Sequence, residues 1–158
     1  MSIEEEVYEL LKKYHLSITT AESCTGGMIA STLIDVPGIS EYLKEAYITY
    51  SNEAKEKLLG VSPVTIEDFT VVSMEVAKEM AAGGKNAADT DICVSATGIA
   101  GPDGGTKDQP VGLVYLGCAC GEMVNAKRFV FEGSRSEVRK QATVEALKLV
   151  KEMILKEV

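Results

Sequence analysis

Residues 17–27 read SITTAESCTGG, a segment that passes from a strand directly into a helix. Residues 17–21 are short and rich in β-branched side chains, as in a strand of a sheet. From about Thr25 apolar residues recur at helical spacing as far as Ile34, and Pro37-Gly38 ends this helix. A strand followed at once by a helix is the repeating unit of α/β proteins, so the segment favours that fold class.

On either side of this segment, helices and strands continue to alternate. The predicted strands are residues 46–50, 92–96, 111–119 and 124–131, the last two forming a hairpin. The predicted helices are residues 3–14, a helix from the N-cap Ser51 to Gly60, a helix from the N-cap Ser73 past Ala81 that Gly83-Gly84 either ends or weakens, and a last helix from the capping box of Ser134 and Glu137 to Ile154. This order predicts a three-layer α/β/α sandwich with a mixed sheet and helices on both faces. A chain of 158 residues buries roughly 70% of its unfolded surface, so residues 1–158 are expected to form one domain.

The composition is that of an ordinary globular protein, with 46% apolar and 25% charged residues. A net charge of −8 argues against a nucleic-acid partner, since affinity for phosphate backbones comes from clustered Lys and Arg. No window holds the run of about 18 apolar residues that a membrane span needs, so we expect a cytoplasmic protein without membrane contact. Cys118 and Cys120 would share one face of a strand, where packing is expected rather than metal binding.

Ser23 is the first candidate for chemistry, because it lies between the predicted strand and the predicted helix. The opening turn of that helix contains Thr25, Gly26 and Gly27, whose N–H groups could hold an oxyanion formed when a carbonyl is attacked. The glycines would let a substrate approach the backbone closely. The alternative is that Ser23 is only an N-cap and the glycines only a tight turn.

A serine hydroxyl needs a base, and this chain has one histidine, His15. It lies at the end of the first predicted helix, where a surface histidine is the ordinary interpretation, and no G-x-S-x-G motif supports a Ser-His-Asp triad. A partly buried lysine is the other known solution, and Lys55 fits it because it follows Tyr50 and Ser51 at a second junction of strand and helix. Tyr50 could relay a proton or hold the lysine in register. By spacing alone, a lysine at position 55 is more often a solvated helix lysine.

Two further segments could bind a phosphate or a carbonyl group. Residues 97–105 form a glycine-rich loop that lacks the Walker pattern, and a purely structural turn is its alternative interpretation. Arg135 and Arg139 lie one turn apart at the start of the last helix, where an anion would also meet the helix dipole. Two solvated arginines that pair with Glu132 or Glu137 are the alternative.

Five motifs in order, with matching spacing, resemble the C-terminal domain family of CinA over nearly the whole chain. They are Thr20–Gly27 (TAESCTGG), Thr49–Lys55 (TYSNEAK), Gly98–Gly105 (GIAGPDGG), Pro110–Gly112 (PVG) and Gly133–Arg135 (GSR). The family includes stand-alone deamidases that hydrolyse nicotinamide mononucleotide to nicotinate mononucleotide and ammonia. The resemblance therefore implies an amidohydrolase of pyridine-nucleotide salvage that needs neither a metal nor an organic cofactor.

The resemblance implies Ser23 as the nucleophile, Lys55 as its base and Tyr50 as an aid to proton transfer. We expect a pyridine mononucleotide as the small-molecule partner and a homo-oligomer as the assembly. The expected substrate-binding residues are Thr25, Gly26, Gly27, Thr97, Gly98, Gly101, Gly104, Gly105, Arg135 and Arg139.

The sequence departs from the family pattern at three places that bear on substrate preference. Thr97 stands where serine is common, Gln109 where lysine is common, and residues 69–73 read FTVVS where HGAVS is usual. Two other functions stay open on the residues alone. One is a nucleotide-binding regulatory module that breaks no bond, and the other is a structural or oligomerisation module.

Overall fold

The computed structural model describes all 158 residues and is built on one five-stranded mixed sheet. Its strands are β1 (Ile18–Glu22), β2 (Tyr47–Ile48), β3 (Ile92–Gly98), β4 (Leu113–Cys120) and β5 (Met123–Val130), and their order in the sheet is β2-β1-β3-β4-β5. β1 runs parallel to both β2 and β3, whereas β4 is antiparallel to β3 and to β5. The predicted mixed sheet and the β4–β5 hairpin are confirmed.

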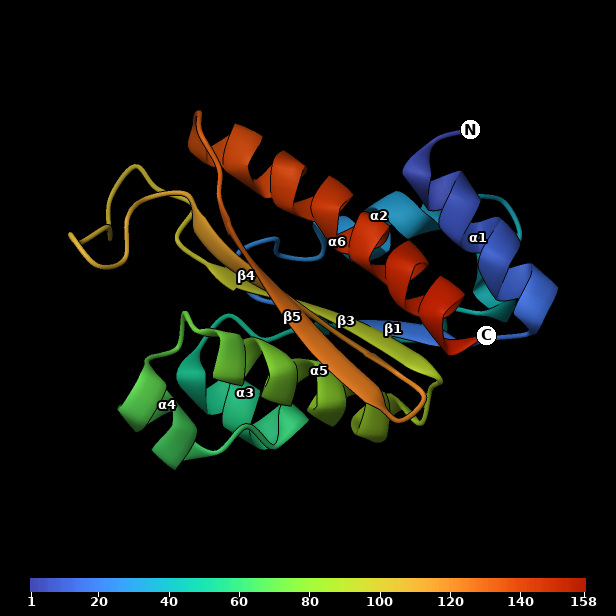
Figure 1. Cartoon of the computed structure of the whole chain (residues 1–158), viewed down its shortest axis with the longest axis horizontal. Coiled ribbons are helices and arrows are strands. Elements are labelled where there is room, and N and C mark those ends of the chain that lie inside the picture. The colour runs from blue at the N-terminus through green and yellow to red at the C-terminus, as the bar shows by residue number, and fades with distance from the viewer.

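Helices cover both faces of this sheet, which confirms the predicted three-layer sandwich (Figure 1). One face carries α1 (Ile3–Tyr14), α2 (Met28–Ile34) and α6 (Arg135–Glu157), and the other carries α3 (Asn52–Leu59), α4 (Pro63–Phe69) and α5 (Met74–Ala88). The larger apolar cluster, of 24 buried residues, lies under α1, α2 and α6. Cys118 and Cys120 belong to it, so both thiols pack in the core on one face of β4.

Serine caps start four of the helices where the sequence places them. Ser51 and Ser73 accept hydrogen bonds from the N–H groups of Ala54 and Val76, and Ser134 forms a full capping box with Glu137. Ser2 caps α1 by accepting a hydrogen bond from the N–H of Glu5, without the reciprocal bond of a capping box. Because these signals are local, the starts of these helices follow directly from the sequence.

The structure decides one alternative that the sequence left open, at Gly83-Gly84, and adds one helix that was not predicted. α5 runs through Gly83-Gly84 to Ala88. Both positions need glycine, because a side chain at position 83 would collide with Leu59 of α3 and one at position 84 with Cys93 of β3. The two glycines therefore allow close packing and do not end the helix. α4 was not predicted, although Ser62 caps it and Pro63 occupies its first turn, a common helix start.

The sheet brings the chemically interesting segments to one edge. β1, β2 and β3 are parallel and end there, β4 begins there, and β5 returns to it before α6 starts. The loop between β3 and β4 projects beyond this edge at the left of Figure 1. Segments far apart in sequence therefore meet at the carboxyl ends of the parallel strands, where open α/β sheets bind ligands.

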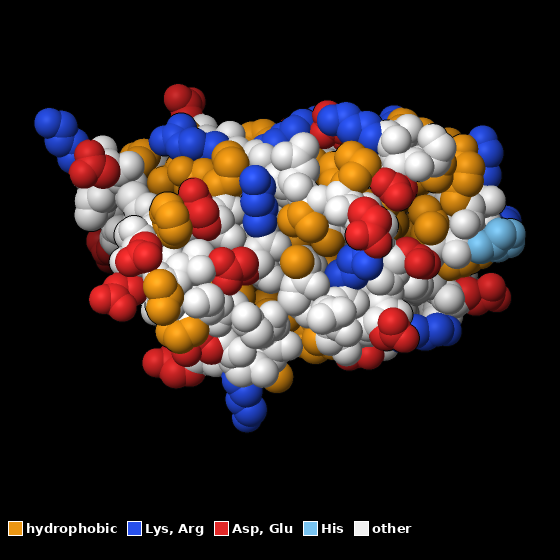
Figure 2. All heavy atoms as spheres, turned by 60° about the horizontal axis from the view of Figure 1, so that its bottom comes forward, with side chains coloured by type: hydrophobic (Ala, Val, Ile, Leu, Met, Phe, Trp, Pro, Cys, Tyr) orange, Lys and Arg blue, Asp and Glu red, His pale blue; other side chains and the backbone are white.

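The outer surface in Figure 2 carries acidic side chains interspersed with separate Lys and Arg side chains, with no continuous basic area on that face. None of the helices is both long and apolar enough to cross a lipid bilayer.

Candidate active site

A cavity of about 300 Å³ lies at this edge of the sheet, at the lower end of the size range of small-molecule sites. Its wall combines the segment after β1, the start of α3, the turn before α5, the β3–β4 loop and the start of α6. The lining residues are Ser23, Cys24, Tyr50, Asn52, Lys55, Val71, Val72, Thr97, Gly98, Ile99, Ala100, Gly101, Asp103, Gly104 and Arg135. A larger hollow, of about 550 Å³, lies between the solvated ends of α1 and α6 and contains no serine or cysteine.

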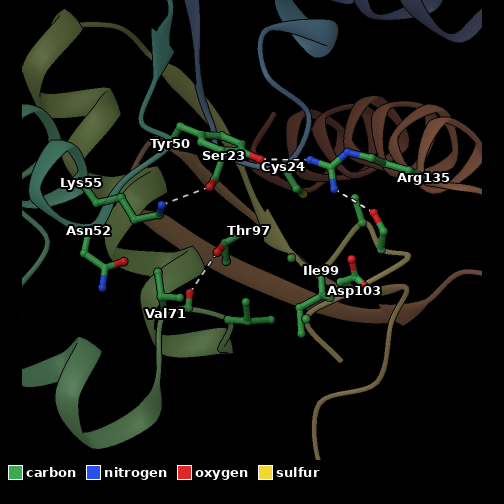
Figure 3. A pocket seen from close by; sticks show the side chains of 15 residues that line it. Ser23, Cys24, Tyr50, Asn52, Lys55, Val71, Thr97, Ile99, Asp103 and Arg135 are labelled. Atoms are coloured by element: carbon green, nitrogen blue, oxygen red, sulfur yellow. Dashed lines mark hydrogen bonds between the residues drawn. The ribbon is translucent and has the colours of Figure 1, made fainter. Parts of the chain in front are cut away.

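Ser23 and Lys55 point toward each other in this cavity (Figure 3). Lys55 Nζ lies 3.1 Å from Ser23 Oγ and 2.8 Å from the carbonyl oxygen of Thr49. The lysine is 2% exposed, and no carboxylate forms an ion pair with it. Burial therefore lowers the pKa of Lys55, with the nearby Cys24 thiol acting in the opposite direction. A lysine held in this way can lose its proton and accept one from the serine.

The Thr49–Lys55 segment places the lysine by local rules. Ser51 caps α3 and accepts a hydrogen bond from the N–H of Ala54 at 3.0 Å, which fixes the first turn of the helix. Lys55 follows one turn later and faces the sheet, whereas Lys57 on the same helix is exposed. The alternative of a solvated lysine at position 55 is therefore wrong.

His15 lies at the opposite end of β1 from Ser23, as the left-handed C-cap residue of α1. The five residues of β1 separate the two side chains by roughly 16 Å. His15 therefore cannot act on Ser23, which removes the Ser-His alternative.

Glu22, the residue before Ser23, has a role that sequence reasoning missed. Its side chain is fully buried and accepts four hydrogen bonds, from the N–H groups of Gly27, Ile29 and Ala30 and from the hydroxyl of Thr20, at 2.8–3.2 Å. The carboxylate thus occupies the N-terminus of α2, where the helix dipole favours negative charge. An acidic residue just before a helix start was the available signal.

The placement of Glu22 changes the expectation for the Thr25-Gly26-Gly27 turn. The N–H of Gly27 donates to Glu22 and that of Gly26 to the carbonyl of Ser23, and none of the three residues lines the cavity. Positive φ angles at both glycines, 58° and 98°, bend the chain away from the site so that α2 begins at Met28. The N–H groups of Cys24 and Thr25 donate to no oxygen of the chain and are the unpaired donors nearest to Ser23.

Arg135 and Arg139 serve different parts of the structure although they lie one turn apart. Arg135 lines the cavity and joins two of its walls, because it donates to Tyr50 Oη at 3.0 Å and to the carbonyl of Gly101 at 2.8 Å. Arg139 lies outside the cavity and donates to the carbonyls of Cys24 and Thr25 at 2.9 and 3.0 Å. Arg139 thus fastens the Ser23 turn from outside the cavity, whereas the sequence predicts a substrate contact for it.

Tyr50 is 65% exposed, and its hydroxyl contacts Arg135, with no hydrogen bond to Ser23 or Lys55. This geometry differs from a tyrosine that bonds directly to the lysine or the serine. The ring lies beside Ser23 in Figure 3 and forms the outer side of the cavity.

The glycine-rich loop supplies Thr97, Gly98, Gly101 and Gly104 to the cavity wall, whereas Gly105 lies outside it, packed against Val111. The Thr97 hydroxyl donates a hydrogen bond to the carbonyl of Val71 at 2.9 Å (Figure 3). The N–H groups of Ala100 and Gly101 have no acceptor in the chain and remain available to a ligand.

Seven residues of the wall were missed from the sequence: four are apolar (Val71, Val72, Ile99 and Ala100), and the other three are Cys24, Asn52 and Asp103. Asn52 and Asp103 line the cavity and make no side-chain hydrogen bond, so both can contact a ligand (Figure 3). Cys24 lies next to the serine, but burial raises the pKa of its thiol to about 11, so it stays protonated at neutral pH and does not compete as a nucleophile. Asn52 and Asp103 belong to the motifs quoted above, but neither residue type singles itself out there.

No group of three or more His, Cys, Asp or Glu side chains is arranged to hold a metal ion. The polar groups that converge on the cavity include a serine, a buried lysine, an arginine, the Asn52 amide, the Asp103 carboxylate and unpaired backbone donors. This combination suits attack on a carbonyl group attached to an anionic or polar ligand.

Comparison with known proteins agrees with this architecture. The CinA C-terminal domain family matches residues 1–154. A CinA-like protein of Kosmotoga olearia is 49% identical over 154 residues, which cover 98% of this chain and 37% of that protein. The chain thus spans less than two fifths of the length of the curated relatives it matches, several of which are named as competence-damage inducible proteins.

Solved structures of the same superfamily are also close in fold. The chain is similar to a CinA superfamily protein of Klebsiella pneumoniae, with a TM-score of 0.93, 30% identity and coverage of 98% of this chain and 96% of that one. It is also similar to a competence/damage inducible protein of Agrobacterium tumefaciens, with a TM-score of 0.89, 35% identity and coverage of 94% and 93%. The chain therefore belongs to the CinA C-terminal domain family.

Proposed function

We propose that the chain is an amidohydrolase that converts nicotinamide mononucleotide into nicotinate mononucleotide and ammonia, as part of pyridine-nucleotide salvage. The observation that carries the proposal is the pair formed by Ser23 and Lys55, 3.1 Å apart in a cavity where the lysine has no acidic partner. A nucleophile with a base within hydrogen-bond distance is the minimum machinery for acyl transfer.

The first half of the reaction forms an ester on Ser23. Neutral Lys55 takes the hydroxyl proton while Ser23 Oγ attacks the carboxamide carbon, and the Thr49 carbonyl fixes the amine by accepting one of its hydrogens. The unpaired N–H of Cys24, a residue of the cavity wall, is the candidate donor to the oxyanion. The lysine then returns the proton to the departing nitrogen, and ammonia leaves.

The second half hydrolyses the ester. Lys55, neutral again, takes a proton from a water molecule that attacks the same carbon, and Ser23 leaves with the proton that the lysine returns. The carboxylate product is nicotinate mononucleotide. These steps need no metal and no organic cofactor.

Charge at the cavity supports a phosphorylated substrate. Arg135 is the arginine of the wall, and the nearby N–H groups of Ala100 and Gly101 are unpaired, so a phosphate can meet a cation and backbone donors together. These local donors act at short range, where a net charge of −8 over the whole chain has little influence at physiological salt.

The test is ammonia release from a panel of pyridine nucleotides. Ser23→Ala and Lys55→Met are expected to lose activity by a factor of about 1,000 or more, as removal of a nucleophile or its base does. Ser31→Ala and Lys57→Met change the same residue types at exposed positions of α2 and α3 and are expected to keep it. Thermal unfolding checks that all four variants fold.

Two results would decide against the amidohydrolase. Saturable binding of the mononucleotide without turnover in the wild type would favour the nucleotide-binding regulatory module. Full activity in Ser23→Ala would remove the serine from the mechanism.

A further inference from the structure

The turn that joins α4 to α5 contains a strained residue, Thr70, directly before the two valines that line the cavity. Thr70 has a φ of 70° and a ψ of 161°, a backbone conformation that glycine adopts easily and that a β-branched residue rarely does. Such a conformation persists only where surrounding contacts hold it, and it is found preferentially at sites that bind ligands. The contacts around Thr70 therefore need an explanation.

Gln109, in the part of the β3–β4 loop that follows the glycine-rich residues, supplies the contact to this turn that spans the greatest distance in sequence. Its side-chain nitrogen donates to Thr70 Oγ1 at 2.9 Å and to the carbonyl oxygen of Val72 at 2.7 Å. Since a carbonyl oxygen can only accept, the nitrogen of the Gln109 amide must face it. Thr106 fixes the backbone of Gln109 in turn, through its hydroxyl at 3.0 Å and its N–H at 2.7 Å.

The same turn is held a second time at Val71. Thr97, at the start of the glycine-rich loop, donates to the carbonyl of Val71 at 2.9 Å. The carbonyls of Val71 and Val72 are thus both tied to the loop, and both residues line the cavity. In the view of Figure 3, Val71 lies on the other side of the cavity from Ser23. These two valines therefore form an apolar wall that faces the nucleophile.

We propose that Gln109 is a positioning residue that makes the site select an aromatic amide. Its amide holds the strained Thr70 turn and so keeps the valine wall at the distance at which a flat ring can pack against it while its carboxamide meets Ser23. This inference rests on the proposed amidohydrolase function and adds to it the group that recognises the ring. Gln109 and Thr70 are also two of the positions at which the sequence departs from the family pattern, and here they contact each other.

The test compares ligands that differ only in the ring. Nicotinate mononucleotide and ribose 5-phosphate are measured as competitive inhibitors of deamidation by the wild type and by Gln109→Glu. The glutamate has the same size but cannot donate, and its charge repels the Val72 carbonyl. We expect inhibition by nicotinate mononucleotide to weaken about tenfold, which is the effect of losing a typical hydrogen-bond contribution, and inhibition by ribose 5-phosphate to stay unchanged.

Two variants control this comparison. Gln141→Glu removes an amide that also donates to two backbone carbonyls, those of Glu132 and Glu137, but on α6 and outside the cavity. It is expected to leave both inhibition constants unchanged. Gln109→Lys restores a donor of similar reach and is expected to recover most of the ring preference.

The outcomes separate this inference from the proposed function. Equal weakening of both inhibitors, no weakening of either, or a loss in Gln109→Lys as large as in Gln109→Glu would overturn the role of Gln109. If the wild type deamidates nothing, the proposed function fails, and Gln109 is judged by the rise in melting temperature that nicotinate mononucleotide causes. A rise that is reduced in Gln109→Glu and kept in Gln141→Glu supports the positioning role, and equal rises refute it.

Discussion

Replacement of Glu22 by glutamine tests the contacts that hold the Ser23 turn, because it removes the negative charge while keeping the size of the side chain. All four partners of the Glu22 carboxylate are donors, and they come from Thr20 and from the first turn of α2. A glutamine of the same size must point its NH₂ group at one pair of these donors. The Thr20 hydroxyl can rotate to accept, but a backbone N–H cannot, so at least one N–H stays unpaired.

The expected loss of stability follows from these contacts. One buried N–H without a partner costs about 1–3 kcal/mol. The remaining two or three hydrogen bonds lose their charge assistance, and the negative charge at the N-terminus of α2 disappears, which adds about 1–2 kcal/mol. We therefore expect Glu22→Gln to lower the free energy of unfolding by about 2–5 kcal/mol, or the melting temperature by roughly 4–20 °C for a chain of this size.

Activity should fall as well, because Glu22 directly precedes Ser23 in the chain, and altered contacts of its side chain are expected to move the serine hydroxyl. A shift of the nucleophile by a fraction of an ångström is expected to reduce kcat by tenfold or more. Urea unfolding and ammonia release measure the two effects. Glu53→Gln, the same change at an exposed position of α3, is the control. A Glu22→Gln protein as stable as Glu53→Gln would refute the account of the Glu22 contacts.

Two further predictions concern the lysine and the glycine pair. Because burial lowers the pKa of Lys55, kcat/KM should rise with pH along a limb that lies below the ordinary lysine pKa of 10.5, and a limb at or above that value would contradict the lysine base. The lowered pKa also affects stability, because Lys55 binds a proton more readily in the unfolded chain than in the folded one. The free energy of unfolding of the wild type should therefore fall relative to that of Lys55→Met as the pH drops below 10.5. Urea unfolding at several pH values measures this difference. Gly84→Ala should destabilise the fold by about 1–3 kcal/mol, because the added methyl group clashes with Cys93, despite the better helix propensity of alanine. Gly60→Ala is the control, since its methyl group meets no neighbour and tests only the cost of a left-handed residue. A stabilised Gly84→Ala would show that the α5 packing is looser than described.

Much of the fold could be predicted because its signals are local. Ser51 and Ser134 are N-cap residues that mark the starts of their helices. The alternation of strands and helices implies parallel strands whose carboxyl ends meet at one edge of the sheet. That rule alone brings Ser23 near Lys55, since both follow such strands. Their roles in catalysis stay predictions.

The remaining parts of the site depend on three-dimensional placement that no local pattern contains. Arg135 and Arg139 lie one turn apart, and only the direction of α6 across the sheet decides which of them enters the cavity. Gly26 and Gly27 looked like open donors, but the buried carboxylate of Glu22 uses the N–H of Gly27. Gln109 contacts residues 37 and 39 positions earlier, a pairing set by the path of a long loop.

The contact between Arg139 and the carbonyl of Cys24 joins residues 115 positions apart. During synthesis on a ribosome, the residues of the Ser23 turn are added long before Arg139, which fastens that turn. A nascent chain that ends before α6 therefore contains Ser23 and Lys55 but lacks the arginine that fastens the Ser23 turn, and the proposed hydrolysis should begin only when that helix has docked. The onset of the proposed amide hydrolysis would then mark the docking of α6. A truncated chain released before α6 is synthesised should be inactive.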